Sequence, residues 1–130
     1  MCKDCNPFVD NKFPAGCIAA QAVEAAGNLG GPDAWNKMKG MIFDRQTGLT
    51  TTKLSLFAGV IGLDTAKFDA ELDSGPVKVA VQNDVTGGQK FVTRFIPTLF
   101  VDGKYVERWK REGDNVLERI LDYAEKHPGE

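Results

Sequence analysis

Cysteines provide the first candidate chemistry in this chain of 130 residues: Cys2 and Cys5 form a Cys-x-x-Cys motif, and Cys17 follows them. Two thiols at this spacing can exchange a disulfide with a substrate when a helix N-terminus favours the reactive thiolate. Here Pro7 disfavours a helix that continues from the motif, and Asp4 between the thiols opposes thiolate formation. The motif can therefore be a catalytic redox pair or a structural pair.

The three thiols leave the disulfide pairing open between Cys2–Cys5, Cys2–Cys17 and Cys5–Cys17, with one thiol to spare. In a reducing cytosol we expect all three to stay reduced. A zinc site made of these thiols and a carboxylate or His127 is disfavoured, because a second Cys-x-x-Cys is missing and the chain has one histidine. We therefore expect no metal and no other cofactor.

The elements that would position these residues are predicted to be a series of helices. Alanine-rich sequence, apolar residues at helical spacing, and Ser, Thr or Asp at the starts predict helices over residues 15–26, 33–45, 53–61, 64–72 and 74–85. Gly30-Gly31-Pro32 is predicted to connect the first two, since proline suits the first turn of a new helix.

The C-terminal part reads as a hairpin followed by a helix. Ile96-Pro97 precedes an apolar strand over residues 99–101, and we expect this peptide bond to be cis at the start of that strand. Asp102-Gly103 suits a two-residue hairpin turn, with a return strand over residues 105–109. An amphipathic helix over residues 115–127 ends the pattern.

Composition is that of one small globular domain over residues 1–130, with 42% apolar residues, 26% charged residues and a net charge of −2. Basic residues gather at one place, Lys104, Arg108, Lys110 and Arg111, which we interpret as a solvated face. We therefore expect no nucleic-acid partner. No stretch resembles a membrane span or a signal peptide, so nothing in this chain directs export and its localisation is left open.

The order of proline, strand, Asp-Gly turn, strand and terminal helix resembles the C-terminal half of a thioredoxin fold. The helices resemble the DsbA-like branch of that family, and the pattern covers about residues 5–127. The matching segments are Ala19-Ala20-Gln21-Ala22, Trp35 to Gln46, Leu49 and Gly62-Leu63-Asp64. Cys5-Asn6-Pro7 together with Cys17 resembles the subset of such domains that is fused to vitamin K epoxide reductase homologues.

This resemblance implies an α+β, truncated thioredoxin-like (DsbA-like) fold that is mostly helical, with a C-terminal hairpin and a terminal helix. It implies a helical subdomain inserted at about residues 15–88, and it leaves the N-terminal βαβ segment of the family missing. Cys2 or Cys5 would attack a substrate disulfide beside Pro97, and Ile96 would contact the substrate backbone. Cys5–Cys17 would be the structural pair in an exported protein.

Two functions follow as expectations. The first is a domain of the thiol–disulfide oxidoreductase family, acting on protein or peptide thiols and disulfides, with weak or absent activity because the βαβ setting of its Cys-x-x-Cys is missing. The alternative is a non-catalytic peptide-binding or scaffold relative. If the chain is a fragment of an exported protein, we expect it outside the cytoplasm. A sheet reduced to one hairpin leaves an edge and a face uncovered, so we also expect a homodimer.

Overall fold

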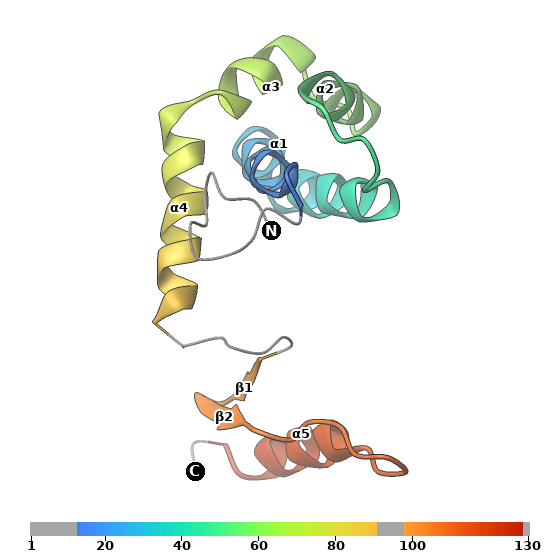
Figure 1. Cartoon of the computed structure of the whole chain (residues 1–130), viewed down its shortest axis with the longest axis vertical. Coiled ribbons are helices and arrows are strands. Elements are labelled where there is room, and N and C mark those ends of the chain that lie inside the picture. The colour runs from blue at the N-terminus through green and yellow to red at the C-terminus, as the bar shows by residue number, and fades with distance from the viewer. Residues whose placement is uncertain (1–12, 91–97, 129–130) are drawn as a thin grey trace. The chain divides into compact units, whose positions relative to one another are not determined.

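The computed structural model describes residues 13–90 and 98–128 (Figure 1). The chain divides into two compact units, Met1–Lys90 and Phe91–Glu130, which we call the helical unit and the C-terminal unit and describe one at a time. The expectation of a single domain over residues 1–130 stays a prediction.

The helical unit consists of α1 (Gly16–Asp44), α2 (Thr51–Val60), α3 (Thr65–Leu72) and α4 (Gly75–Gln89). α1 is two helical arms joined by a kink, because Gly31 has φ 71° and ψ −166° and Pro32 follows it. Such a positive φ suits glycine, and proline starts the second arm without losing a needed N–H donor. The predicted connector is therefore present as a kink, and the first arm continues past residue 26, where the predicted helix ends.

Side-chain caps fix where the next three helices begin. Thr50 Oγ1 accepts a hydrogen bond from the Lys53 backbone N–H at 3.2 Å, and Asp64 Oδ1 accepts one from the Lys67 N–H at 2.9 Å. Ser74 Oγ accepts a longer one, 3.4 Å, from the N–H of Val77. Each cap satisfies a backbone donor that the first helical turn leaves unpaired.

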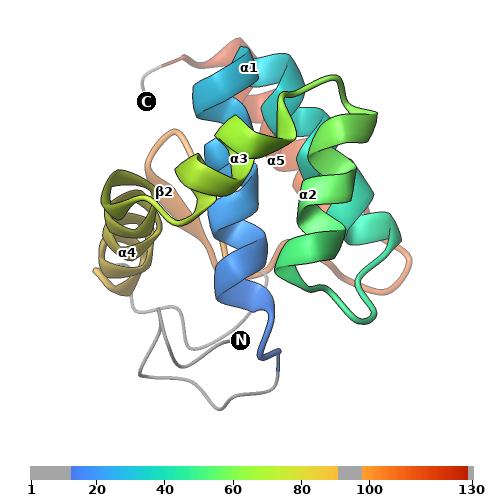
Figure 2. The same cartoon turned by 90° about the horizontal axis from the view of Figure 1, so that it is seen from above.

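The core of the helical unit lies around both arms of α1. Figure 2 shows α1 between α2 and α4, with α3 crossing over it, and α1 contacts all three of these helices. The largest side chains that are fully buried here are Phe68, Met38, Leu54 and Val77. Small residues on α1, Ala22, Ala25 and Ala26, are fully buried as well and let the neighbouring helices approach closely. The apolar residues at helical spacing are core only in part, since Ala66 is exposed and Trp35 and Val85 are half-buried.

The C-terminal unit consists of β1 (Leu99–Val101), β2 (Lys104–Val106) and α5 (Val116–Lys126), which contacts β1. The strands pair antiparallel, with Leu99 opposite Val106. Both turn residues have positive φ, 49° at Asp102 and 77° at Gly103, as a two-residue hairpin of the predicted kind requires. Val106 is the one described hydrophobic residue of this unit that is buried, and α5 has none.

The expected α+β, thioredoxin-like class is wrong. The described residues are 67% helical, and their only sheet is the two-stranded hairpin, whose strands pair with each other alone. A thioredoxin-like fold is organised around a sheet, whereas the elements of the helical unit are organised around the helix α1. The predicted cis bond at Ile96-Pro97 lies outside the described residues.

Candidate functional site

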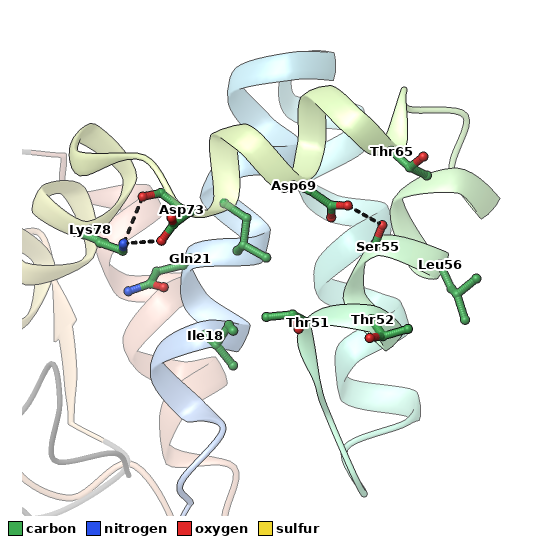
Figure 3. A pocket seen from close by; sticks show the side chains of 11 residues that line it. Ile18, Gln21, Thr51, Thr52, Ser55, Leu56, Thr65, Asp69, Asp73 and Lys78 are labelled. Atoms are coloured by element: carbon green, nitrogen blue, oxygen red, sulfur yellow. Dashed lines mark hydrogen bonds and ion pairs between the residues drawn. The ribbon is translucent and has the colours of Figure 1, made fainter.

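A hollow of about 580 Å³ lies in the helical unit, where α1, α2, α3 and the start of α4 meet (Figure 3). Its lining is rich in hydroxyl and carboxyl groups, and most of these come from α2 and α3. The lining residues are Ile18, Gln21, Thr51, Thr52, Ser55, Leu56, Thr65, Asp69, Leu72, Asp73 and Lys78. We call it the hydroxyl-lined hollow.

Two polar contacts hold its wall together. Ser55 Oγ donates to Asp69 Oδ2 at 3.2 Å and so joins α2 to α3. Lys78 Nζ donates to Asp73 Oδ1 at 2.6 Å and to the Asp73 backbone carbonyl at 2.9 Å. Figure 3 draws both contacts. Three threonines of the lining, Thr51, Thr52 and Thr65, are exposed residues.

The electrostatics of the hollow favour binding over acid–base catalysis. The hydrogen bond and the charge of Lys78 lower the pKa of Asp73 below its usual 3.8, so this carboxylate stays ionised at neutral pH and has no proton to give. Ser55 bonds a carboxylate, and the helical unit has no histidine of its own to act on the serine. A nucleophilic serine needs such a base.

A second hollow of about 650 Å³ lies where the two ends of α1 meet the start of α2, and it is mostly apolar. Phe13 and Phe43 line it and are 56% and 67% exposed. Ile18 lines both hollows, so an apolar surface borders the polar one.

Of the predicted site residues, the structure describes one. Cys17 is buried at the start of α1 and is disulfide-bonded, so it has a structural role there. Cys2, Cys5, Ile96 and Pro97 lie outside the described residues, so the Cys5–Cys17 pairing and the substrate contact at Ile96-Pro97 stay predictions. Among the residues described, no group of three His, Cys, Asp or Glu side chains could hold a metal ion.

The sequence reasoning missed the hydroxyl-lined hollow. Threonines at a predicted helix start indicate a cap, and Thr50 in the run Thr50-Thr51-Thr52 is indeed the cap of α2. The other two hydroxyls line the hollow with groups from α3. A helix start needs only one hydroxyl as its cap. The additional threonines were therefore the signal in the sequence that pointed to the hollow.

Comparison with known proteins finds similarity to part of a transporter. The chain is 37% identical over 91 residues to the Na(+)/H(+) antiporter NhaA of Herminiimonas arsenicoxydans. This match takes in 70% of the chain and 14% of the antiporter, so the chain spans a small part of that relative's length. No family model and no solved structure matches the chain. Within residues 13–90 and 98–128, no helix has the length and apolar character needed to cross a membrane.

These findings overturn the assignment to the DsbA-like family and to its subset fused to vitamin K epoxide reductase homologues. The protein that the chain resembles is named as an antiporter, and no thioredoxin-like family was found. The expected thiol–disulfide oxidoreductase function, with its peptide-binding or scaffold alternative in the same fold, is wrong for the same reason. The motifs behind it, such as an Asp-Gly turn or a Gly-Leu-Asp joint, are short and serve local turn and cap geometry in many folds.

Proposed function

We propose that this chain is an accessory module of a Na⁺/H⁺ antiporter, which works beside the part of the protein that exchanges the ions. The observation that carries this proposal is the 91-residue match to the antiporter NhaA. The matched residues make up 14% of that antiporter. A segment of that size can be a folded module attached to a much longer transporter.

The packing of the helical unit supports a module that folds by itself. Phe68, Met38, Leu54 and Val77 are fully buried by contacts among α1, α2, α3 and α4. Burying a large apolar side chain contributes about 1.5–3 kcal/mol, and here the neighbours that bury it come from the same unit. The module therefore needs no transporter helix to complete this core.

The charged side chains of the helical unit support a position in water. On the second arm of α1, Lys37 and Asp33 form an ion pair at 2.7 Å while their side chains remain 55% and 79% exposed. Lys78 and Asp73 form another exposed pair. Exposed charges of this kind are costly in the hydrocarbon of a bilayer, so this surface suits the aqueous side of a transporter.

The hydroxyl-lined hollow gives the module a means of attachment. Its Thr and Ser hydroxyls, the carboxylate of Asp69 and the apolar rim of Ile18 and Leu56 suit a polar peptide segment with an apolar residue at one end. We propose that a segment of the transporting part docks there.

Grafting tests the function directly. The NhaA antiporter of Herminiimonas arsenicoxydans would be produced in three forms: intact, with the matched segment deleted, and with that segment replaced by this chain. Na⁺-dependent dissipation of a proton gradient in everted membrane vesicles would be measured per antiporter molecule. We expect deletion to lower this activity or shift its pH dependence, and the replacement to restore it.

Two results would overturn the proposal. One is a deletion form that matches the intact antiporter in amount, activity and pH dependence. The other is Na⁺/H⁺ exchange by this chain alone in proteoliposomes, which would make it the transporting part. A graft that carries Ser55→Ala and Thr52→Val tests the docking role of the hollow, with Thr86→Val, on the exposed part of α4 outside the hollow, as the matched control.

A further inference from the structure

The C-terminal unit contains a hollow of about 790 Å³ whose wall is dominated by cations. Arg108, Lys110, Arg111 and Arg119 line it, and Asp114 is the one carboxylate of the lining. Asp114 is already paired, since its Oδ2 accepts a hydrogen bond from Arg119 at 3.0 Å. The lining therefore carries an excess of three positive charges.

The other three cations are not neutralised. Among the described residues, the side chains of Arg108, Lys110 and Arg111 form no ion pair. Like charges that line one hollow repel one another, and an anion that enters the hollow relieves this repulsion. Arginine in particular binds phosphate through two parallel hydrogen bonds.

The rest of the lining is apolar. Val116 and Ile120 on α5 face this hollow together with the ring of Tyr123. A free inorganic anion or a wholly acidic peptide such as polyglutamate would leave this surface unused. A phospholipid uses both parts, because it joins an anionic headgroup to an apolar body, and tyrosine suits the boundary between them.

We infer that this hollow, the basic hollow of the C-terminal unit, binds the headgroup of an anionic phospholipid. The inference rests on the proposed function in one respect: an accessory module of an antiporter works within reach of a bilayer. Each basic side chain near an anionic surface strengthens binding by about fivefold. The three unpaired cations together should then strengthen it by roughly a hundredfold.

The test is binding of the whole chain to vesicles in a flotation assay. Vesicles of phosphatidylcholine alone would be compared with vesicles that also contain phosphatidylglycerol. We expect binding to the anionic vesicles only, weakened by salt, and weakened roughly a hundredfold in the triple variant R108Q, K110Q, R111Q. The matched control removes three exposed charges from the helical unit, as K37Q, K67Q, K90Q, and should keep nearly full binding.

Equal losses in the two triple variants would overturn the inference, because net charge alone would then explain the binding. Absence of binding to anionic vesicles would also overturn it. Full competition by inorganic phosphate would assign the hollow to a free anion, and stronger binding of polyglutamate than of vesicles would assign it to an acidic peptide.

The salt dependence of the unmodified chain keeps the test valid if the triple variant fails to fold. Since the assay needs no antiporter, a chain that restores transport in the graft without binding lipid would refute this inference and leave the proposed function intact.

Discussion

The two units of this chain bury their apolar residues to very different degrees. In the helical unit, α3 is only eight residues long, yet Phe68 is fully buried and Leu72 is nearly so. In the C-terminal unit, α5 has eleven residues and a well-marked apolar face, yet no residue of α5 is buried. Leu121 on α5 is 50% exposed, and Phe100 on β1 is 44% exposed.

The difference shows what an apolar stripe does and does not determine. Periodic apolar residues favour a helix with one apolar face, but burial requires neighbouring elements that cover this face. The helical unit supplies three helices around α1, whereas the described part of the C-terminal unit supplies a two-stranded hairpin. A hairpin with one helix is too small to enclose a core.

The largest effect should come from emptying the core of the helical unit. Phe68→Ala removes a fully buried ring, and we expect a loss of about 3–5 kcal/mol in the free energy of unfolding. Phe43→Ala is the matched control, because this ring is 67% exposed, and it should cost well under 1 kcal/mol. Urea unfolding followed by circular dichroism measures both. Similar losses in the two variants would mean that the core is not where the structure has it.

The next effect concerns the disulfide at the start of α1. Cys17→Ser removes a disulfide-bonded, buried cysteine, and we expect a loss of about 2–4 kcal/mol. A reducing agent should lower the stability of the unmodified chain by a similar amount and leave the variant unchanged. A variant as stable as the unmodified chain, in both conditions, would contradict a structural role for this cysteine.

The exposed apolar residues among those described in the C-terminal unit lead to a smaller effect. We propose that a second copy of the chain covers them, as a homodimer. Leu121→Asp should then weaken the dimer by about tenfold, since half of a leucine side chain is worth about 1 kcal/mol of burial and the charge adds to the cost. Sedimentation equilibrium over a range of concentrations measures this. A chain that remains monomeric at every concentration would refute the dimer.

A cap in the helical unit should matter less. Ser74→Ala removes the side chain that caps α4, and we expect a loss of about 1 kcal/mol. The control is Thr86→Ala, whose hydroxyl bonds the Gln82 carbonyl within the same helix. Because alanine is the better helix former, this control should be neutral or slightly stabilising. Thermal unfolding distinguishes the two.

The smallest effect is a pH dependence at Asp73. Lys78 lowers the pKa of Asp73 in the folded chain, so the pair stabilises the fold above the ordinary carboxyl pKa, and this contribution is lost as the pH falls through the lowered value. NMR titration should show a pKa for Asp73 below 3.8, the ordinary value. Lys78→Met should move it back toward that value. An unchanged pKa of Asp73 in the Lys78→Met variant would show that the ion pair does not cause the lowered value.

Local chemistry was predictable from the sequence, and global assignment was not. Asp64 and Ser74 identify the starts of α3 and α4 because capping depends on a few adjacent residues. The same holds for the turn at Asp102-Gly103. α2 begins at Thr51, two residues before its predicted start, with Thr50 as its cap. The end of α4 was placed too early, near residue 85, because Gly87 and Gly88 continue the helix to Gln89.

The family and the site depend on longer-range information. The predicted local elements are correct, but their order resembles a fold that the chain does not have. Such elements recur in unrelated proteins. The hydroxyl-lined hollow draws its residues from four helices between Ile18 and Lys78, and no short motif brings these positions together. The basic hollow was visible as a cluster near Arg108, but its apolar lining from α5 was not.

The kink in α1 has a consequence for engineering. Replacing glycine with alanine is a common way to stiffen a helix, yet three glycines close together resist it here. A Cβ atom on Gly27 would lie 2.9 Å from Trp35 Cδ1, and one on Gly30 would lie 2.6 Å from Ala34 Cβ. Gly31 has open space around it but a φ of 71° that alanine rarely adopts. A library that enriches helix formers throughout α1 would therefore disrupt the fold at these three glycines. Helix propensity alone would predict the greatest gain in stability at these same positions.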